Sequence, residues 1–158
     1  GQMRLSYLIV YATIATLIMW VVWNKTTFGK NIYAVGGNPE AAKVSGVNVT
    51  RTLILVYVIA GVLYALGGFL EAVRIGSETN NVGNLYELDA IAACVVGGVS
   101  FSGGIGKIKG VITGVLIFTL INYGLSYIGV SPYWQYIIKG LIIISAVAID
   151  TLKYRKRT

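Results

Sequence analysis

The sequence has no histidine and one cysteine, Cys94, which lies within an apolar segment. A disulfide framework or a thiolate metal site needs more than one cysteine, so both are excluded. Histidine is the commonest residue of metal sites and catalytic triads, so these chemistries lose their usual side chain. We therefore expect no metal, no catalytic residue and no cofactor bound by this chain, which is not predicted to be an enzyme.

Charge is also scarce. Charged residues make up 12% of the chain and hydrophobic residues 56%, whereas ordinary soluble domains carry about 25% charged residues. A soluble domain of 158 residues needs only one core, and this chain has more apolar surface than one core can bury. Apolar runs approaching ~20 residues are typical of membrane spans. The composition predicts an all-α fold, a polytopic transmembrane helix bundle.

Five apolar segments are separated by polar, glycine-rich or proline-containing stretches. Their expected bounds are about 5–23, 53–72, 88–99, 111–128 and 134–152, and the polar stretch 24–51 is the longest connection. The third segment is only about 18 Å long as a helix, so either its flanks extend it across ~30 Å of hydrocarbon or other helices bury it. The opening residues 1–4 do not resemble a signal peptide, and we interpret the chain as part of a longer polypeptide.

Basic residues are distributed unevenly between the connections, which predicts an orientation. One side holds ten basic residues, Lys25, Lys30, Lys43, Arg51, Lys107, Lys109, Lys153, Arg155, Lys156 and Arg157, and the other holds three, Arg4, Arg74 and Lys139. The positive-inside rule makes the first side cytoplasmic. Five crossings then leave the C-terminus in the cytoplasm. The basic tail adjoins a span, so we expect it to face anionic lipid and no nucleic acid.

The stretch "GGNPEAAKVSG" predicts a short cytoplasmic helix. Asn38 is a good N-cap, Pro39 suits the first helical position, Glu40 complements the positive helix end, and Gly46 is a natural terminator. Its small side chains would let another surface approach closely: Ala41, Ala42 and Ser45. Two interpretations remain open, a loop helix packed on its own domain and a docking helix for a soluble partner.

Residues 106–126 carry two further patterns. Gly106, Gly110 and Gly114 recur at four-residue spacing, which favours close helix packing in lipid. Four polar side chains share one face of the following helix, Thr119, Asn122, Tyr123 and Ser126. This polar stripe could line a polar pathway through the membrane, or it could form hydrogen bonds between helices, since a mid-membrane Asn must be paired or face water.

Two motifs fail on inspection. Glu87 and Asp89 could suggest a catalytic pair, but no base, metal ligand or nucleophile accompanies them, and a cap on the outer end of segment 88–99 is simpler. "GGIGKIKG" is not a phosphate-binding loop, because the P-loop pattern needs glycine where Phe101 stands and serine or threonine where Ile108 stands.

The Glu40-Ala41-Ala42 triplet, followed by Gly46, resembles the cytoplasmic "EAA…G" motif of ABC importer permeases. The stretches "YAVGGNPEAAKVSGVNV" and "YELDAIAACVVGGVSFSGG" look like the ribose and galactose type of that family, and "INYGLSYIGVSPYWQYIIKG" is especially similar to its galactose and methyl-galactoside members. The similarity covers essentially the whole chain. One departure is the absence of proline from residues 47–58, where the wider motif continues with Ile-x-Leu-Pro.

The resemblance implies the C-terminal half of a permease in the bacterial inner membrane. It further implies a second permease subunit, forming a homodimer, ATPase subunits that bind ATP and magnesium, and a periplasmic sugar-binding protein. The residues that would couple the permease to the ATPase are Asn38, Pro39, Glu40, Ala41, Ala42, Ser45 and Gly46. Transport would follow alternating access. Two rival functions stay open, an ion-coupled secondary transporter, disfavoured by the scarcity of charge within the spans, and a non-transporting membrane scaffold.

Overall fold

The computed structural model describes residues 7–76 and 82–155, which form seven helices and no strand. Four of the helices are long and apolar enough to span a membrane: α1 (Tyr7–Lys25), α4 (Val49–Ile75), α6 (Ile108–Tyr127) and α7 (Pro132–Arg155). The predicted all-α polytopic helix bundle is confirmed. The third expected segment is helix α5 (Tyr86–Val96), whose 11 residues cover about 16 Å, less than a bilayer core.

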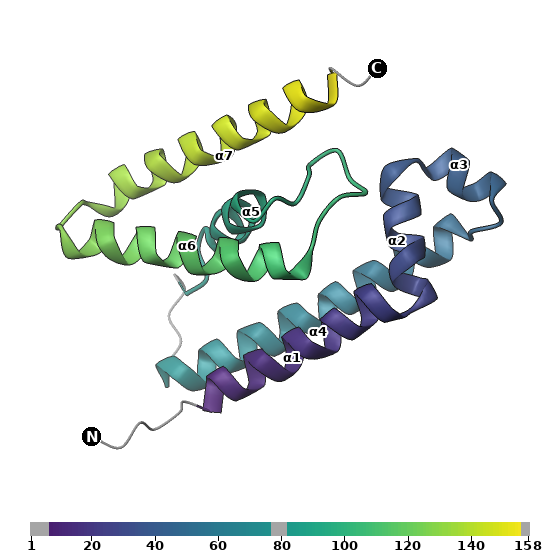
Figure 1. Cartoon of the computed structure of the whole chain (residues 1–158). Helices are drawn as coiled ribbons and strands as arrows, with labels where there is room; N and C mark the ends of the chain where they lie inside the picture. Colours follow the sequence, from purple (N-terminus) through teal and green to yellow (C-terminus); the bar gives the residue numbers. More distant parts are fainter. Residues whose placement is uncertain (1–6, 77–81, 156–158) are drawn as a thin grey trace. The chain divides into compact units, whose positions relative to one another are not determined.

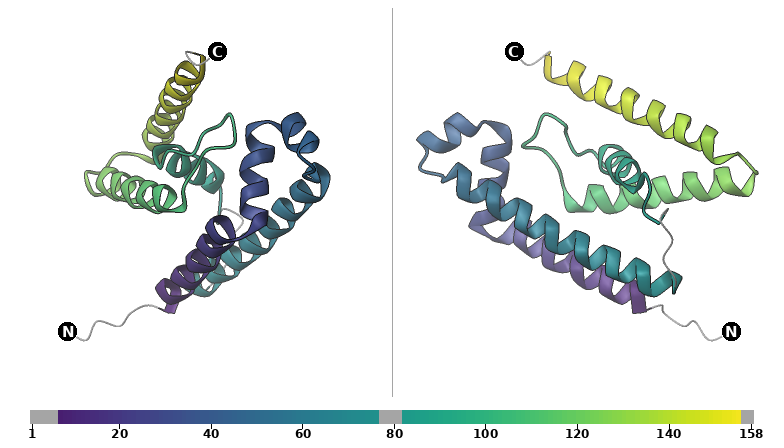
Figure 2. Two further views of the ribbon diagram at one scale, coloured as in Figure 1. Left: turned by 45° about the vertical axis from the view of Figure 1, so that its right-hand side comes forward. Right: turned by 180° about the vertical axis from the view of Figure 1, so that it is seen from behind.

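The chain divides into two units, residues 1–82 and residues 83–158. The first unit contains α1 and α4, which run alongside one another in the views of Figures 1 and 2. Two shorter helices connect them at one end, α2 (Thr27–Gly37) and α3 (Pro39–Val44). Helix α3 is predicted by its caps, whereas α2 is not predicted from the sequence pattern.

The turn from α1 into α2 is tight. Thr26 is the one residue between the two helices, and its hydroxyl donates to the Val22 carbonyl at 2.6 Å and accepts from the Gly29 amide at 3.2 Å. A Cβ at Gly29 would lie 2.1 Å from the Trp23 carbonyl oxygen, so only glycine fits at this contact. The close approach ties α2 directly to the end of α1.

In the second unit, α6 and α7 run antiparallel and are joined by the turn 128–131, while α5 packs against both. Gly129 has φ +82° in this turn, and the Gly129 and Val130 amides donate to the Ser126 and Leu125 carbonyls, as in a Schellman cap. Helix α5 lies between α6 and α7, where it is seen nearly end-on (Figure 1). The core of the unit draws on all three helices: Ala92, Ala93, Phe118, Ile142 and Ile143.

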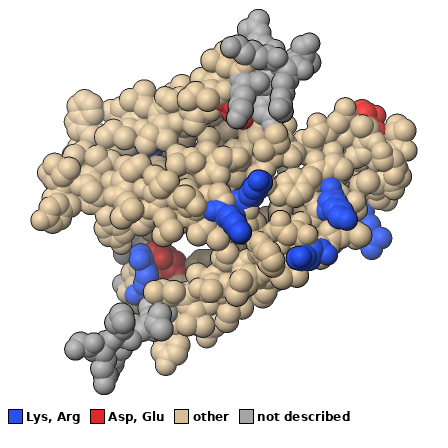
Figure 3. Space-filling view, viewed as in Figure 1, with Lys and Arg blue, Asp and Glu red and all other residues tan. Residues whose placement is uncertain are grey.

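The long helices carry large apolar side chains on open faces. Tyr57, Tyr64 and Phe69 of α4 are 65–77% exposed, and few charged side chains interrupt the face drawn in Figure 3. Apolar surface of this extent marks contact with lipid or with another protein rather than with water. Together with the four helices of membrane-spanning length, this surface indicates that the chain is embedded in a membrane.

The basic side chains of the first unit lie near the α2–α3 end. Lys25, Lys30, Lys43 and Arg51 are all exposed there, while α4 carries the Glu71–Arg74 ion pair (2.7 Å) in its last turns. Arg4, Lys156 and Arg157, which belong to the predicted charge asymmetry, lie outside the described residues. The described part of the first unit thus has a basic end, and the orientation itself stays a prediction.

Candidate functional site

Helix α3 begins at a well-formed cap. Asn38 has an extended backbone (φ −156°, ψ 102°), and its side-chain oxygen accepts a hydrogen bond from the Ala41 amide at 3.0 Å. Pro39 occupies the first turn, where its missing N–H is no loss, and Glu40 faces the positive end of the helix. The Asn38 amide also donates to the Ala34 carbonyl of α2 at 3.0 Å. One residue therefore ends α2 and starts α3.

The other end of α3 is a Schellman motif. Gly46 has φ +82°, and its amide donates to the Lys43 carbonyl while the Val47 amide donates to the Ala42 carbonyl. Ser45 adds a side-chain bond to the Ala41 carbonyl at 2.9 Å. A six-residue helix is marginal alone in water, so caps at both ends and packing account for its order.

Helix α3 connects to the spanning helix α4 through a short loop. Asn48 caps α4, since its side-chain oxygen accepts from the Arg51 amide at 2.9 Å, and its carbonyl accepts from the Thr52 hydroxyl at 2.9 Å. Thr52 is buried. Helix α2 packs against α1, α3 and α4. Helix α3 is therefore linked to two membrane-length helices, to α4 through the Asn48 cap and to α1 through α2.

The predicted coupling residues divide between two faces of α3. Ala42 is 4% exposed and packs within the first unit, whereas Ala41 is exposed. The other predicted residues are also exposed: Asn38, Pro39, Glu40, Ser45 and Gly46. Val44, which the sequence pattern does not single out, is 89% exposed. The outward surface is thus small and mixed, with one protruding apolar side chain at the C-terminal end of the helix.

The glycines of the second unit lie where α5 meets α6. A Cβ at Gly110 would lie 2.2 Å from the Gly97 carbonyl oxygen, and one at Gly114 would lie 2.1 Å from the Ala93 carbonyl oxygen. Gly106 precedes α6, and a Cβ there would meet the Val99 side chain at 3.3 Å. At Gly110 and Gly114 the two backbones are in direct contact, a separation that no side chain allows.

The polar stripe on α6 has mixed surroundings. Thr119 and Tyr123 are exposed, and the Ser126 hydroxyl accepts a long hydrogen bond (3.4 Å) from the Gln135 amide of α7. Asn122 is partly buried, and its side-chain oxygen has no hydrogen-bond partner among the described residues. Ser126 thus bonds between helices, while Thr119 and Tyr123 face outward from this unit and Asn122 holds a buried acceptor.

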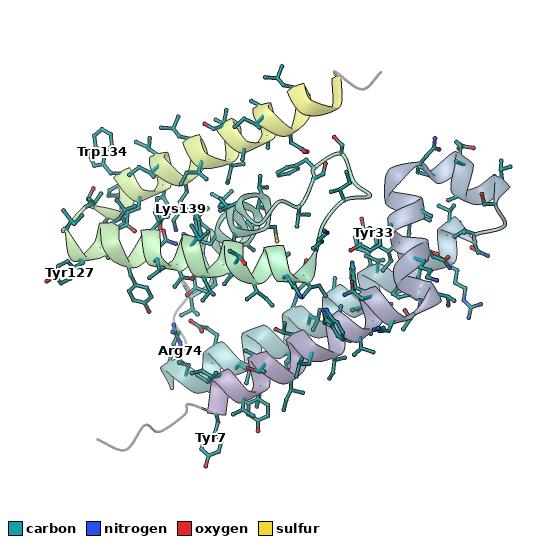
Figure 4. All side chains as sticks on the ribbon, in the orientation of Figure 1. Tyr7, Tyr33, Arg74, Tyr127, Trp134 and Lys139 are labelled. Carbon is teal, nitrogen blue, oxygen red and sulfur yellow. The ribbon has the colours of Figure 1, made fainter. Side chains whose placement is uncertain are left out.

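A partly buried ion pair joins α5 to α7, and the sequence pattern misses it. Lys139, only 8% exposed, places its ammonium 2.5 Å from a carboxylate oxygen of Asp89 in the first turn of α5. The same ammonium lies 5.9 Å from the Phe118 ring and 5.7 Å from the Tyr136 ring. Lys139 stands among the side chains between α6 and α7 in Figure 4. Its spacing of fifty residues from Asp89 offers no local signal.

Comparison with known proteins identifies relatives along nearly the whole chain. The family described as branched-chain amino acid transport system / permease component matches residues 2–147. The galactose/methyl galactoside import permease protein MglC of Haemophilus influenzae is 71% identical over 99% of this chain and 47% of its own length. The MglC protein of Escherichia coli is 70% identical with the same coverage.

A related sugar permease is more distant. The ribose import permease protein RbsC of Bacillus subtilis is 47% identical over 89% of this chain and 44% of its own length. The chain thus spans about half the length of the curated relatives that it matches. No solved structure matches it.

Proposed function

The chain belongs to the family of branched-chain amino acid transport system permease components, and from this premise we propose that it forms part of the permease subunit of an ATP-driven bacterial sugar importer. The sugar is galactose, a methyl galactoside or a related monosaccharide. The observation that carries the proposal is the 71% identity to a galactose/methyl galactoside import permease over 99% of the chain. The chain acts in transport and not as an enzyme.

In this proposal α3 is the coupling helix to the ATPase, which binds ATP and magnesium on a separate subunit. Its exposed residues supply the contact: Asn38, Pro39, Glu40, Ala41, Ser45 and Gly46, with Val44 as an apolar addition. Ala42 instead holds the helix on its own unit. Two observations support this role of α3: both of its ends are capped, and a short connection through Asn48 leads to α4.

The wider assembly follows from the same premise. We place the protein in the inner membrane with its basic ends and C-terminus in the cytoplasm. Its partners are a second copy of the permease, two ATPase subunits, a periplasmic sugar-binding protein and lipid. Thr119, Asn122 and Tyr123 are proposed to line the pathway, and Gly106, Gly110 and Gly114 to serve helix packing.

A crosslink tests the coupling contact. Ala41→Cys is placed in the full-length permease with Cys94→Ala, and the ATPase carries single surface cysteines. We expect a disulfide whose yield changes with nucleotide, and a second one with Val44→Cys. Ala42→Cys is the matched control, because the Ala42 side chain is buried and a cysteine there should not crosslink to the ATPase. An assembled complex that crosslinks at neither Ala41 nor Val44 would show that α3 is structural and contradict the proposal.

Uptake of labelled galactose separates the three functions. The importer requires ATP hydrolysis, and an ATPase variant unable to hydrolyse ATP abolishes uptake. Uptake that instead stops when ion gradients are dissipated, with the hydrolysis-deficient ATPase present, indicates the ion-coupled transporter. A chain that supports no uptake of any monosaccharide with its partners present indicates the scaffold.

A further inference from the structure

We propose that residues 83–107 form one interrupted membrane crossing, in which α5 covers part of the bilayer and the loop 97–107 completes it. Two ties to α7 hold this segment at its depth: the Asp89–Lys139 ion pair and the hydrogen bonds that Asp150 accepts from the loop. The crossing is independent of the proposed function. By contrast, the role of Asp89 and Lys139 as positioning residues for transport rests on the proposed function.

The two ties show that the segment advances along α7. Asp89 meets Lys139, and Ser100 donates its hydroxyl to Asp150 at 2.7 Å. From Lys139 to Asp150 is eleven residues of helix, or about 16 Å. Residues 89–100 therefore run in the same direction as α7 and cover about half of a ~30 Å hydrocarbon core.

The charges at the helix ends require a crossing in this segment. Lys43 and Arg51 lie beside the start of α4, and Lys107 and Lys109 lie at the start of α6. The positive-inside rule puts both starts in the cytoplasm. Helix α4 leads away from that side and ends at Ile75, so the chain must return across the membrane before Lys107.

Several backbone amides of the loop 97–107 are hydrogen-bonded, as irregular backbone at membrane depth requires. The Phe101 amide donates to the Asp150 carboxylate at 3.1 Å, and the Ser102 amide donates to the Ser100 hydroxyl at 3.1 Å. The Ser100 amide donates to the Ile105 carbonyl at 3.0 Å. Non-helical backbone is tolerated inside a membrane only where protein groups or water satisfy it, and Asp150 supplies that partner from α7.

The Asp89–Lys139 ion pair fixes the outer part of α5 against α7. Lys139 is seven residues beyond Pro132, about 10 Å along α7, and its ammonium is enclosed by Phe118 and Tyr136. A buried lysine is costly unless it is paired. Asp89, in the first turn of α5, supplies the opposite charge. Displacing α5 would leave this ammonium unpaired, so the pair locks the half-helix against α7.

Labelling from the two sides of the membrane tests the crossing. Single cysteines replace Asn84 or Ile105, both exposed, in the full-length permease with Cys94→Ala. A membrane-impermeant maleimide is applied to spheroplasts before and after permeabilisation. We expect Asn84→Cys to react from outside and Ile105→Cys only after permeabilisation. Reaction of both from the outside would mean that α5 re-enters without crossing, and would overturn the proposal.

Charge variants test the positioning role, with uptake divided by the amount of permease in the membrane. Asp89→Asn leaves Lys139 unpaired, and we expect uptake to fall at least about tenfold. Adding Lys139→Gln should restore uptake to within about threefold of the parent. Glu87→Gln, in the same turn, is the control and should leave uptake unchanged. If the double variant stays as impaired as Asp89→Asn, the charges serve transport directly and the positioning role is refuted.

One further variant tests the positioning role even if Asp89→Asn does not reach the membrane. The exchanged pair, Asp89→Lys with Lys139→Asp, keeps opposite charges at both positions, and we expect it to recover membrane amount and uptake. No recovery in the exchanged and neutral double variants would refute the positioning role. A parent complex without any sugar uptake would refute the proposed function, whereas the labelling result would still decide the crossing.

Discussion

Replacing Gly114 by alanine should displace α5 from α6. The added Cβ would lie 2.1 Å from the Ala93 carbonyl oxygen, 2.6 Å from the Gly97 nitrogen and 2.8 Å from its Cα, all of which are backbone atoms. An ordinary contact begins near 3.4 Å, so the two helices must separate by about 1.3 Å at this point. No side-chain rotation can relieve the clash.

The cost can be isolated with a matched variant. Gly124 lies in the same helix, and a Cβ there meets nothing within 4 Å. Alanine is favoured over glycine in a helix by about 1 kcal/mol at both positions, so this gain cancels in the comparison. What remains is overpacking, about 2–3 kcal/mol for a rigid backbone contact. In the full-length permease, about twice as long as this chain if it resembles its relatives, Gly114→Ala should therefore melt roughly 3–4 °C below Gly124→Ala.

The assay is thermal unfolding of the full-length permease in detergent, followed by size-exclusion fluorescence. Gly140→Ala in α7, also without a neighbour within 4 Å, serves as a second reference. Equal melting temperatures for Gly114→Ala and the two references would refute the reasoning, because the backbone contact between α5 and α6 would then be absent from the folded protein.

Three further outcomes are expected. Asn38→Ala removes the cap of α3 and should cost about 1 kcal/mol, so ATPase stimulation by the sugar-binding protein falls, while Asn38→Asp retains it. Gly46→Ala forces φ +82° on a residue with a Cβ, at about 1–2 kcal/mol; sugar uptake decreases, and uptake equal to the parent contradicts the Schellman cap. Asp150→Asn weakens the bonds from Ser100 and Phe101, so a cysteine at Ile105 reacts faster with maleimide, and an unchanged rate argues against the tie.

Features with local causes could be predicted from the sequence. The four spanning helices follow from apolar length, and α3 follows from Asn38, Pro39 and Gly46, whose preferences act within one turn. The observed spans differ from the expected ones by a few residues, as with α4, which runs from Val49 to Ile75 and not from 53 to 72. Capping extends a helix into polar sequence that hydropathy alone leaves out.

Helix α2 could not be predicted, because its stability comes from packing. Its sequence "TFGKNIYAVGG" contains three glycines, which are poor helix formers. Gly29 is required by the backbone contact with Trp23, and Val35 is buried. Propensity disfavours this helix, and the surrounding chain imposes it.

What the sequence by itself determined is the class of the molecule: a membrane-embedded all-α bundle with a basic polar segment and a short helix capped at both ends. Apolar length and capping act between neighbours in the chain, so they can be read without coordinates. The tertiary structure alone decided that Ala42 faces inward and Ala41 outward, and that Asp89 and Lys139 meet. Both features depend on contacts between segments that are far apart in the sequence, and such contacts form only when the chain is folded.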